Sequence, residues 1–175
     1  LLQKMTDGKG ENRYLINCID NAYADGSATV AISGGTFVGF DPNVSPEKKV
    51  DGKTPSFAAP GVGITKNENG SFTAVDGMTA QILDKDGNSV KAYSTLAEAI
   101  NAAQDGQTVR LLADVAESSI KVNANITIDL NKMTVTGSFV TYGEVTIQNG
   151  TIDVPDGKTN YAYGKLTLAD VDITG

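Results

Sequence analysis

The sequence predicts a mainly β protein, in which stacked coils form a solenoid and one short helix closes an end. Thr- and Val-rich runs with alternating apolar residues are typical of half-buried strands. Three of these runs start at Ile126, Val145 and Leu166, which are 19 and 21 residues apart. A repeat of about twenty residues indicates a solenoid, whose coils bury their apolar faces by stacking on their neighbours.

The first 60 residues are predicted to be a strand-rich segment that ends in a Pro-rich loop. The runs ENRYLINCID and SATVAISGGTFVGF resemble strands, and Asp25-Gly26 between them is a turn signal. Four of the five prolines lie within residues 41–60, so this stretch is expected to lack regular structure. The single cysteine, Cys18, lies in an apolar run and is expected to be a buried small hydrophobe.

Residues 61–93 are predicted to form a β-hairpin connector, with turns at residues 67–70 and at Asp86-Gly87. The stretch DKDGN, residues 84–88, also raises the question of a calcium loop. Its glycine is the fourth residue, whereas an EF-hand loop requires glycine at the sixth. A hairpin turn is therefore favoured, and Asp84 and Asp86 would bind calcium only weakly.

The third predicted part, residues 94–175, begins with the one amphipathic helix, over residues 94–105. Its apolar stripe consists of Leu96, Ala99, Ile100 and Ala103. Thr95 and Glu98 have the spacing of a capping box, and Gly106 stands where a helix would end. Because solenoids need caps with a polar outer face, we expect this helix to cover the first coil. The side chains expected to face solvent are Glu98, Asn101 and Gln104.

Alternation also indicates which side chains point into the coils. On the first face they are Ile126, Ile128, Leu130, Val145, Ile147, Leu166 and Leu168. On the second face they are Ile152, Val171 and Ile173.

Composition excludes several classes of function. Asp and Glu exceed Lys and Arg by 21 to 14, which gives a net charge of -7 and argues against a nucleic-acid partner. No apolar run approaches the roughly 20 residues that a membrane helix needs. The chain has no histidine, so a Ser-His-Asp or Cys-His triad is excluded, and with a single cysteine a thiolate or imidazole metal site is not expected. It begins at Leu1 without a signal-peptide pattern, which suggests a fragment or a processed form.

The stretch STLAEAINAAQDGQTVRLLADV, followed by ITIDLNKMTVTG, resembles the start of a right-handed parallel β-helix of the pectin-lyase-like type. The resemblance covers roughly residues 93–175 and is closer to repeat-bearing surface proteins of gut bacteria and to fibre proteins of their phages. In those proteins glycine is commoner at the position of Lys132, a corner change that the fold is expected to tolerate. The stretch GGTFVGFDP, residues 34–42, resembles the closing coil of such a β-helix.

The resemblance also raises the possibility of an enzyme, because some proteins of this fold cleave or de-esterify acidic polysaccharides. That chemistry needs carboxylates and cations on one face. The carboxylates in or beside the coil strands are Asp129, Asp153, Asp170 and Asp172, and the nearby cations are Lys132, Lys158 and Lys165. None has a catalytic spacing, and we interpret the four carboxylates as solvated corner and face residues.

The best candidates for binding are Tyr142, Tyr161 and Tyr163, which lie in the glycine-containing corners VTYGEV and NYAYGKL. Exposed tyrosine rings on neighbouring corners would form a platform for the apolar faces of sugars, and tyrosine is also a favoured contact residue at protein interfaces. The alternative is that the rings pack over the coil corners and shield the backbone.

We therefore expect a non-enzymatic structural and adhesive module of an extracellular fibre or cell-surface protein. Its mechanism is geometric, because a stiff β-helical rod displays corner loops for contact with a host surface or its glycans. A phage head or tail fibre protein that forms a homotrimer is one alternative. A lyase or esterase that acts on polysaccharides is the other. No cofactor, metal or membrane insertion is expected.

Overall fold

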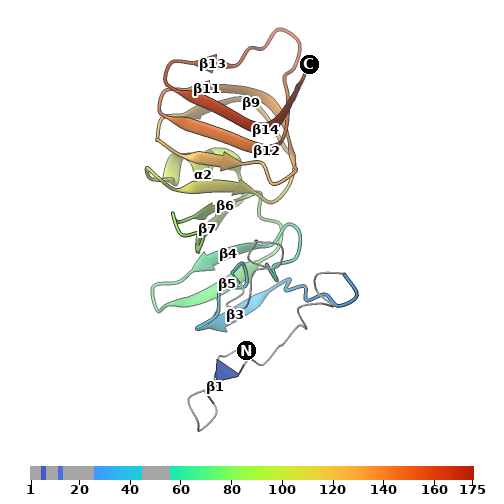
Figure 1. Cartoon of the computed structure of the whole chain (residues 1–175), viewed down its shortest axis with the longest axis vertical. Helices are drawn as coiled ribbons and strands as arrows, with labels where there is room; N and C mark the ends of the chain where they lie inside the picture. Colours follow the sequence, from blue (N-terminus) through green and yellow to red (C-terminus); the bar gives the residue numbers. More distant parts are fainter. Residues whose placement is uncertain (1–4, 7–11, 14–25, 45–55) are drawn as a thin grey trace.

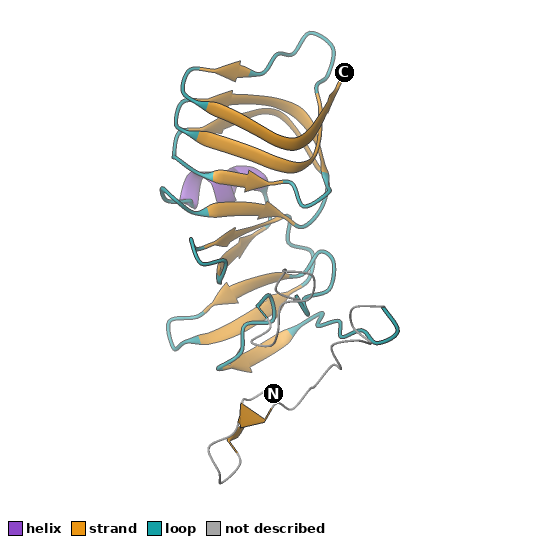
Figure 2. Cartoon of the chain, in the orientation of Figure 1, coloured by secondary structure: helices purple, strands orange, loops and turns teal. Residues whose placement is uncertain are grey.

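The computed structural model describes residues 5–6, 12–13, 26–44 and 56–175. These residues form three sets of paired strands, which follow one another along the length of the molecule (Figures 1 and 2). The first set is the antiparallel pair of β1 (Met5–Thr6) and β2 (Asn12–Arg13). Cys18 lies outside the described residues, so its predicted burial stays a prediction.

The second set is a three-stranded antiparallel sheet in the order β3-β5-β4. Its strands are β3 (Gly35–Val38), β4 (Gly63–Lys66) and β5 (Ser71–Val75). β4 and β5 form the first predicted hairpin, and this sheet has its own small core around Phe37 and Ile64. The resemblance of residues 34–42 to a closing coil does not hold here, because β3 pairs antiparallel with β5 rather than parallel with a coil strand.

The second predicted hairpin belongs to the solenoid. β6 (Ala80–Leu83) and β7 (Ser89–Tyr93) pair antiparallel, and β6 also pairs antiparallel with β8 (Thr108–Leu111), the first solenoid strand. The two hairpins of residues 61–93 therefore divide between two sheets instead of forming one connector.

The solenoid makes about three turns, and its coils have three faces. Its remaining strands are β9 (Val115–Val122), β10 (Thr127–Asp129), β11 (Thr134–Thr141), β12 (Val145–Asp153), β13 (Tyr161–Ala162) and β14 (Leu166–Thr174). The first face stacks β8, β10 and the first halves of β12 and β14 in parallel. The second face stacks the first halves of β9 and β11 on the later halves of β12 and β14. The third face stacks the later halves of β9 and β11 with β13.

Side chains from all three faces fill the interior of the coils. The predicted inward residues Ile126, Ile128, Leu130, Val145, Ile147 and Ile152 are buried, and Leu166 and Val171 are half-buried against this core. Leu168 and Ile173 differ, being 43% and 52% exposed. They lie on β14, and no described strand stacks on its outer side.

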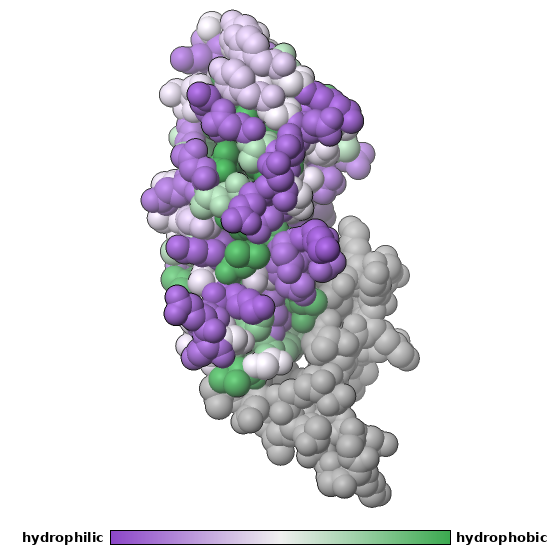
Figure 3. Space-filling model, turned by 90° about the vertical axis from the view of Figure 1, so that its left-hand side faces the viewer, coloured by the Kyte–Doolittle hydropathy of each residue, from purple (hydrophilic) through white to green (hydrophobic). Residues whose placement is uncertain are grey.

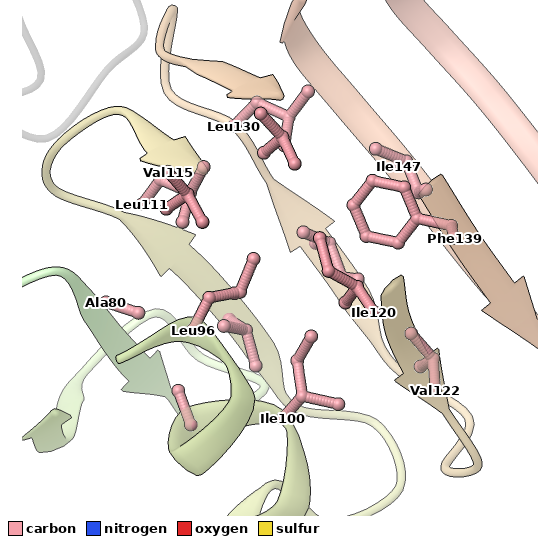
Figure 4. Close-up of a cluster of buried hydrophobic side chains, with 14 of the residues drawn as sticks. Ala80, Leu96, Ile100, Leu111, Val115, Ile120, Val122, Leu130, Phe139 and Ile147 are labelled. Carbon is pink, nitrogen blue, oxygen red and sulfur yellow. The ribbon is translucent and has the colours of Figure 1, made fainter. Parts of the chain in front are cut away.

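The predicted helix is present as α2 (Leu96–Ala102), which is shorter than the expected 94–105 and ends before Gly106. Thr95 caps it by accepting a hydrogen bond from the Glu98 backbone N–H, and it ends at Ala102 because Ala103 has extended backbone, at φ −68° and ψ 141°. Leu96 and Ile100 point into the interior of the first coil, toward Ile120 (Figure 4). The cap is thus the helix together with the β6–β7 hairpin, which supplies Ala80 and Ile82 to the same core.

Candidate functional site

The three predicted tyrosines lie together at one corner of the solenoid. Tyr142 directly follows β11, and Tyr161 and Tyr163 lie in and directly after β13, on the next coil. Gly143 follows Tyr142 and Gly164 follows Tyr163, and close packing against the preceding coil explains both glycines. A Cβ atom at Gly164 would lie 2.4 Å from the carbonyl oxygen of Tyr142.

The rings of Tyr142, Tyr161 and Tyr163 form a continuous stack, which we call the tyrosine ladder. Tyr142 and Tyr163 have ring centroids 5.0 Å apart and planes at 9° to each other. Tyr161 and Tyr163 have centroids 6.5 Å apart and planes at 21°. These separations are within the range of favourable aromatic pairs. Tyr142, Tyr161 and Tyr163 are nevertheless 47%, 53% and 69% exposed, so packing on one another leaves about half of the ladder in water.

Lys121 extends the ladder, and the sequence reasoning missed it. Its ammonium nitrogen lies 5.1 Å from the centroid of the Tyr142 ring, within the range of a cation–π contact. The coil period did not indicate this contact, because Lys121 pairs with Val140, two residues before Tyr142, and so reaches the ring diagonally. The site therefore combines aromatic faces, phenol hydroxyls and one ammonium group.

The structure corrects the interpretation of Asp129 as a solvated residue. Its side chain is buried and accepts hydrogen bonds from Arg110 Nε at 3.0 Å and from Asn149 Nδ2 at 3.0 Å. The partners lie 19 and 20 residues away on neighbouring coils, so they meet only when the coils stack. Asp153 is half-buried and accepts from Thr174 Oγ1 at 3.0 Å.

The remaining candidate carboxylates do not converge on one site. Asp170 and Asp172 are exposed, and no group of three or more His, Cys, Asp or Glu side chains suited to a metal ion occurs among the described residues. Lys158 and Lys165 are exposed as well, and neither forms an ion pair within the described part of the chain.

The turn at residues 84–88 closes the β6–β7 hairpin, as predicted. Burial alone would raise the pKa of Asp84, but hydrogen bonds from the Asn88 side chain and from the backbone of Asn88 and Asp86 outweigh it and lower this pKa. The Asp84 carboxylate is thereby occupied within the turn, with Asn88 Nδ2 at 3.0 Å and the Asp86 N–H at 2.9 Å.

The sequence matches no protein-family model, and neither curated proteins nor solved structures gave a match to this chain. The described residues contain no helix that is long and apolar enough to cross a membrane.

Proposed function

We propose that this chain is a non-enzymatic structural and adhesive module of an extracellular fibre or surface protein, and that the tyrosine ladder is its contact surface for glycans. The observation that carries the proposal is the exposed stack of Tyr142, Tyr161 and Tyr163. The resemblance to the surface and fibre proteins of gut bacteria and their phages supports the same setting.

The shape of the coil stack suits a display role. Every strand of the solenoid is hydrogen-bonded to a neighbouring coil, so a corner side chain is held on a continuous core rather than on a free loop. Hydrophilic side chains cover much of one side of the molecule, with smaller hydrophobic areas between them (Figure 3). An exposed aromatic stack is unusual on such a surface, because tyrosine is normally at least partly buried.

The ladder also has the chemistry that a sugar needs. A sugar ring has apolar C–H faces that pack on aromatic rings, and hydroxyl groups that bond to phenol oxygens. Lys121 adds a cation beside Tyr142, which favours glycans that carry a carboxylate or sulfate group.

The test is binding to immobilised mucin O-glycans, measured by biolayer interferometry with the full chain. Stacking contributes about 0.5–1.5 kcal/mol for each ring, so Tyr163→Ala is expected to weaken binding by roughly 2- to 12-fold. Tyr163→Phe keeps the ring and should lose less. Val38→Ala is the control, because Val38 is also an exposed hydrophobic residue, at 47%, but lies on β3. Equal binding by Tyr163→Ala and Val38→Ala would contradict the proposal.

A second candidate is a phage fibre in which three chains associate, and the exposed Leu168 and Ile173 favour it. Chains that shared these apolar side chains would bury them against one another. Light scattering after size exclusion tests this candidate, since it predicts the mass of a trimer and is contradicted by the mass of one chain, 18.2 kDa.

A polysaccharide lyase or esterase is not favoured by the carboxylates of the solenoid. Asp129 is engaged by Arg110 and Asn149, and Asp153 by Thr174. These contacts account for the two carboxylates as structural groups of the coil stack.

A further inference from the structure

A cavity of about 310 Å³ lies between the solenoid and the loop that precedes β4. Arg110, Leu112, Asn131 and Met133 line it on the solenoid side, and Pro60 and Val62 belong to the loop side. Ligand pockets often form at such boundaries between structural units, and they combine apolar walls with a few polar groups. The cavity is remote in sequence and in fold from the tyrosine ladder, which lies on the third face of the solenoid.

Arg110 is the residue of this cavity that has hydrogen-bond donors available for a ligand. Its Nε donates to Asp129 Oδ2 at 3.0 Å, and Nη1 and Nη2 have no hydrogen-bond partner among the described residues. Asn131 N–H and Asn149 Nδ2 donate to the other oxygen of Asp129, so that carboxylate is itself held in place. The guanidinium is thus fixed through Nε, while its two Nη groups are the pair that binds a carboxylate in bidentate fashion.

The other polar side chains contribute little. Asn43 is engaged at both ends of its amide, since Nδ2 donates to Ser89 Oγ and Oδ1 accepts from Ser56 Oγ. The Asn131 side chain donates through Nδ2 to the Leu111 carbonyl, which leaves its Oδ1 as one acceptor. A sugar has many hydroxyl groups to satisfy, and this lining offers too few partners for them.

We propose that this cavity binds a carboxylate attached to an aliphatic group. The Nη groups of Arg110 receive the carboxylate, and Pro60, Leu112 and Met133 contact the aliphatic part. Two sources share this chemistry: the C-terminus of a peptide that ends in an aliphatic residue, and a free aliphatic acid. Because Asp129 balances the charge of Arg110, affinity depends on bidentate hydrogen bonds and apolar contact rather than on long-range attraction. For a ligand of this size we expect a dissociation constant of about 1 mM.

The test is a titration of the full ¹⁵N-labelled chain, followed by NMR, with three probes: N-acetyl-leucine, 4-methylpentanoate and N-acetyl-leucinamide. The two acids should shift the Arg110 Nε–H resonance and the Leu112 amide, whereas the neutral amide should not. Tighter binding of N-acetyl-leucine indicates a peptide C-terminus, and tighter binding of 4-methylpentanoate indicates a free acid. Absence of saturable shifts with both acids, or equal shifts with the amide, would overturn the proposal.

Two variants locate the binding. Arg110→Lys keeps a cation beside Asp129 but loses the forked geometry, so we expect at least roughly tenfold weaker binding. Ala59→Leu narrows the cavity that Ala59 lines and leaves Arg110 intact, so it should abolish binding. Lys132→Ala is the control, because it removes a neighbouring cation that does not line the cavity. Wild-type affinity in either Arg110→Lys or Ala59→Leu would refute the assignment.

Discussion

The corner at Lys132 makes a sharp prediction: Lys132→Gly should stabilise the protein. Lys132 has a φ of 68°, in the left-handed region that favours glycine. Among the described residues, the other non-glycine residues with positive φ are Asn131, Asn149 and Asp170, whose short polar side chains tolerate this region. Lysine has no such compensation, and its side chain is exposed without an ion pair among the described residues.

The magnitude follows from two opposing terms. Left-handed backbone costs a non-glycine residue about 1–2 kcal/mol, and glycine gives back about 0.4–1 kcal/mol through its greater freedom in the unfolded chain. The net gain therefore lies between about 0 and about 1.6 kcal/mol, with a central value of about 0.8 kcal/mol. The backbone bond from Lys132 N–H to the Asn149 carbonyl, 2.7 Å long, is kept and adds no further difference. For a chain of this length the unfolding temperature should rise by about 2–3 °C.

The assay is urea unfolding of the wild type, Lys132→Gly and Lys132→Ala, with thermal unfolding as a second measure. Alanine removes the lysine charge but keeps a Cβ atom in the left-handed region, so its unfolding free energy should stay within about 0.5 kcal/mol of the wild type. A glycine variant that is no more stable than the alanine variant would refute the reasoning, since relief of the backbone strain is expected to exceed the entropy that glycine gains in the unfolded chain.

Three further outcomes are expected. Ile147→Ala should cost about 2–5 kcal/mol in urea unfolding, because Ile147 is fully buried between coils. The N–H and the hydroxyl of Ser89 both donate to the Asp41 carboxylate at 2.9 Å. Asp41→Ala should therefore lower the free energy of unfolding by about 1–3 kcal/mol and speed hydrogen exchange at the Ser89 amide. Asp41→Asn keeps one acceptor oxygen, so its free energy of unfolding should fall less. The backbone N–H and then the side chain of Asn125 lower the pKa of Asp105 below 3.8. The stabilisation from these hydrogen bonds is fully present above the unfolded-state pKa of Asp105 and is lost as the pH falls through its lowered pKa in the folded state. Between about pH 7 and about pH 3 the free energy of unfolding of the wild type should therefore fall by more than that of Asp105→Asn.

The alternation of apolar residues and the repeat of the coils predicted the first two faces of the solenoid but not the third. Ile128 and Ile147 alternate with threonines in long runs, and both are buried in register with each other. On the third face, Ile120 and Phe139 lie in short runs with serines, glycine and lysine, so the two-residue period is too brief to recognise. They are buried because each coil turns again after the second face, which closes the interior.

The sequence likewise predicted some residues of the candidate site and not others. The three tyrosines were predicted from their glycine-containing corners, because these motifs are local in sequence. Lys121 and the contact between Arg110 and Asp129 were not predicted, because their partners lie on neighbouring coils. Such contacts depend on the exact coil length, and here one coil step varies from 19 to 21 residues.

The coil stack itself determines the geometry of the tyrosine ladder. Hydrogen-bonded strands lie roughly 4.7–4.9 Å apart, and the rings of Tyr142 and Tyr163 are 5.0 Å apart. Side chains at the same position of successive coils therefore stack at nearly the strand spacing, without tilting of the rings. Stacking on a neighbouring ring restricts these side chains in the free protein, so a ligand that docks on the ladder loses less entropy in ordering them. A residue inserted between Tyr161 and Tyr163 would turn one ring away from the other, because alternate residues of a strand point to opposite faces. On this reasoning the spacing of the two tyrosines matters to binding as much as their identity.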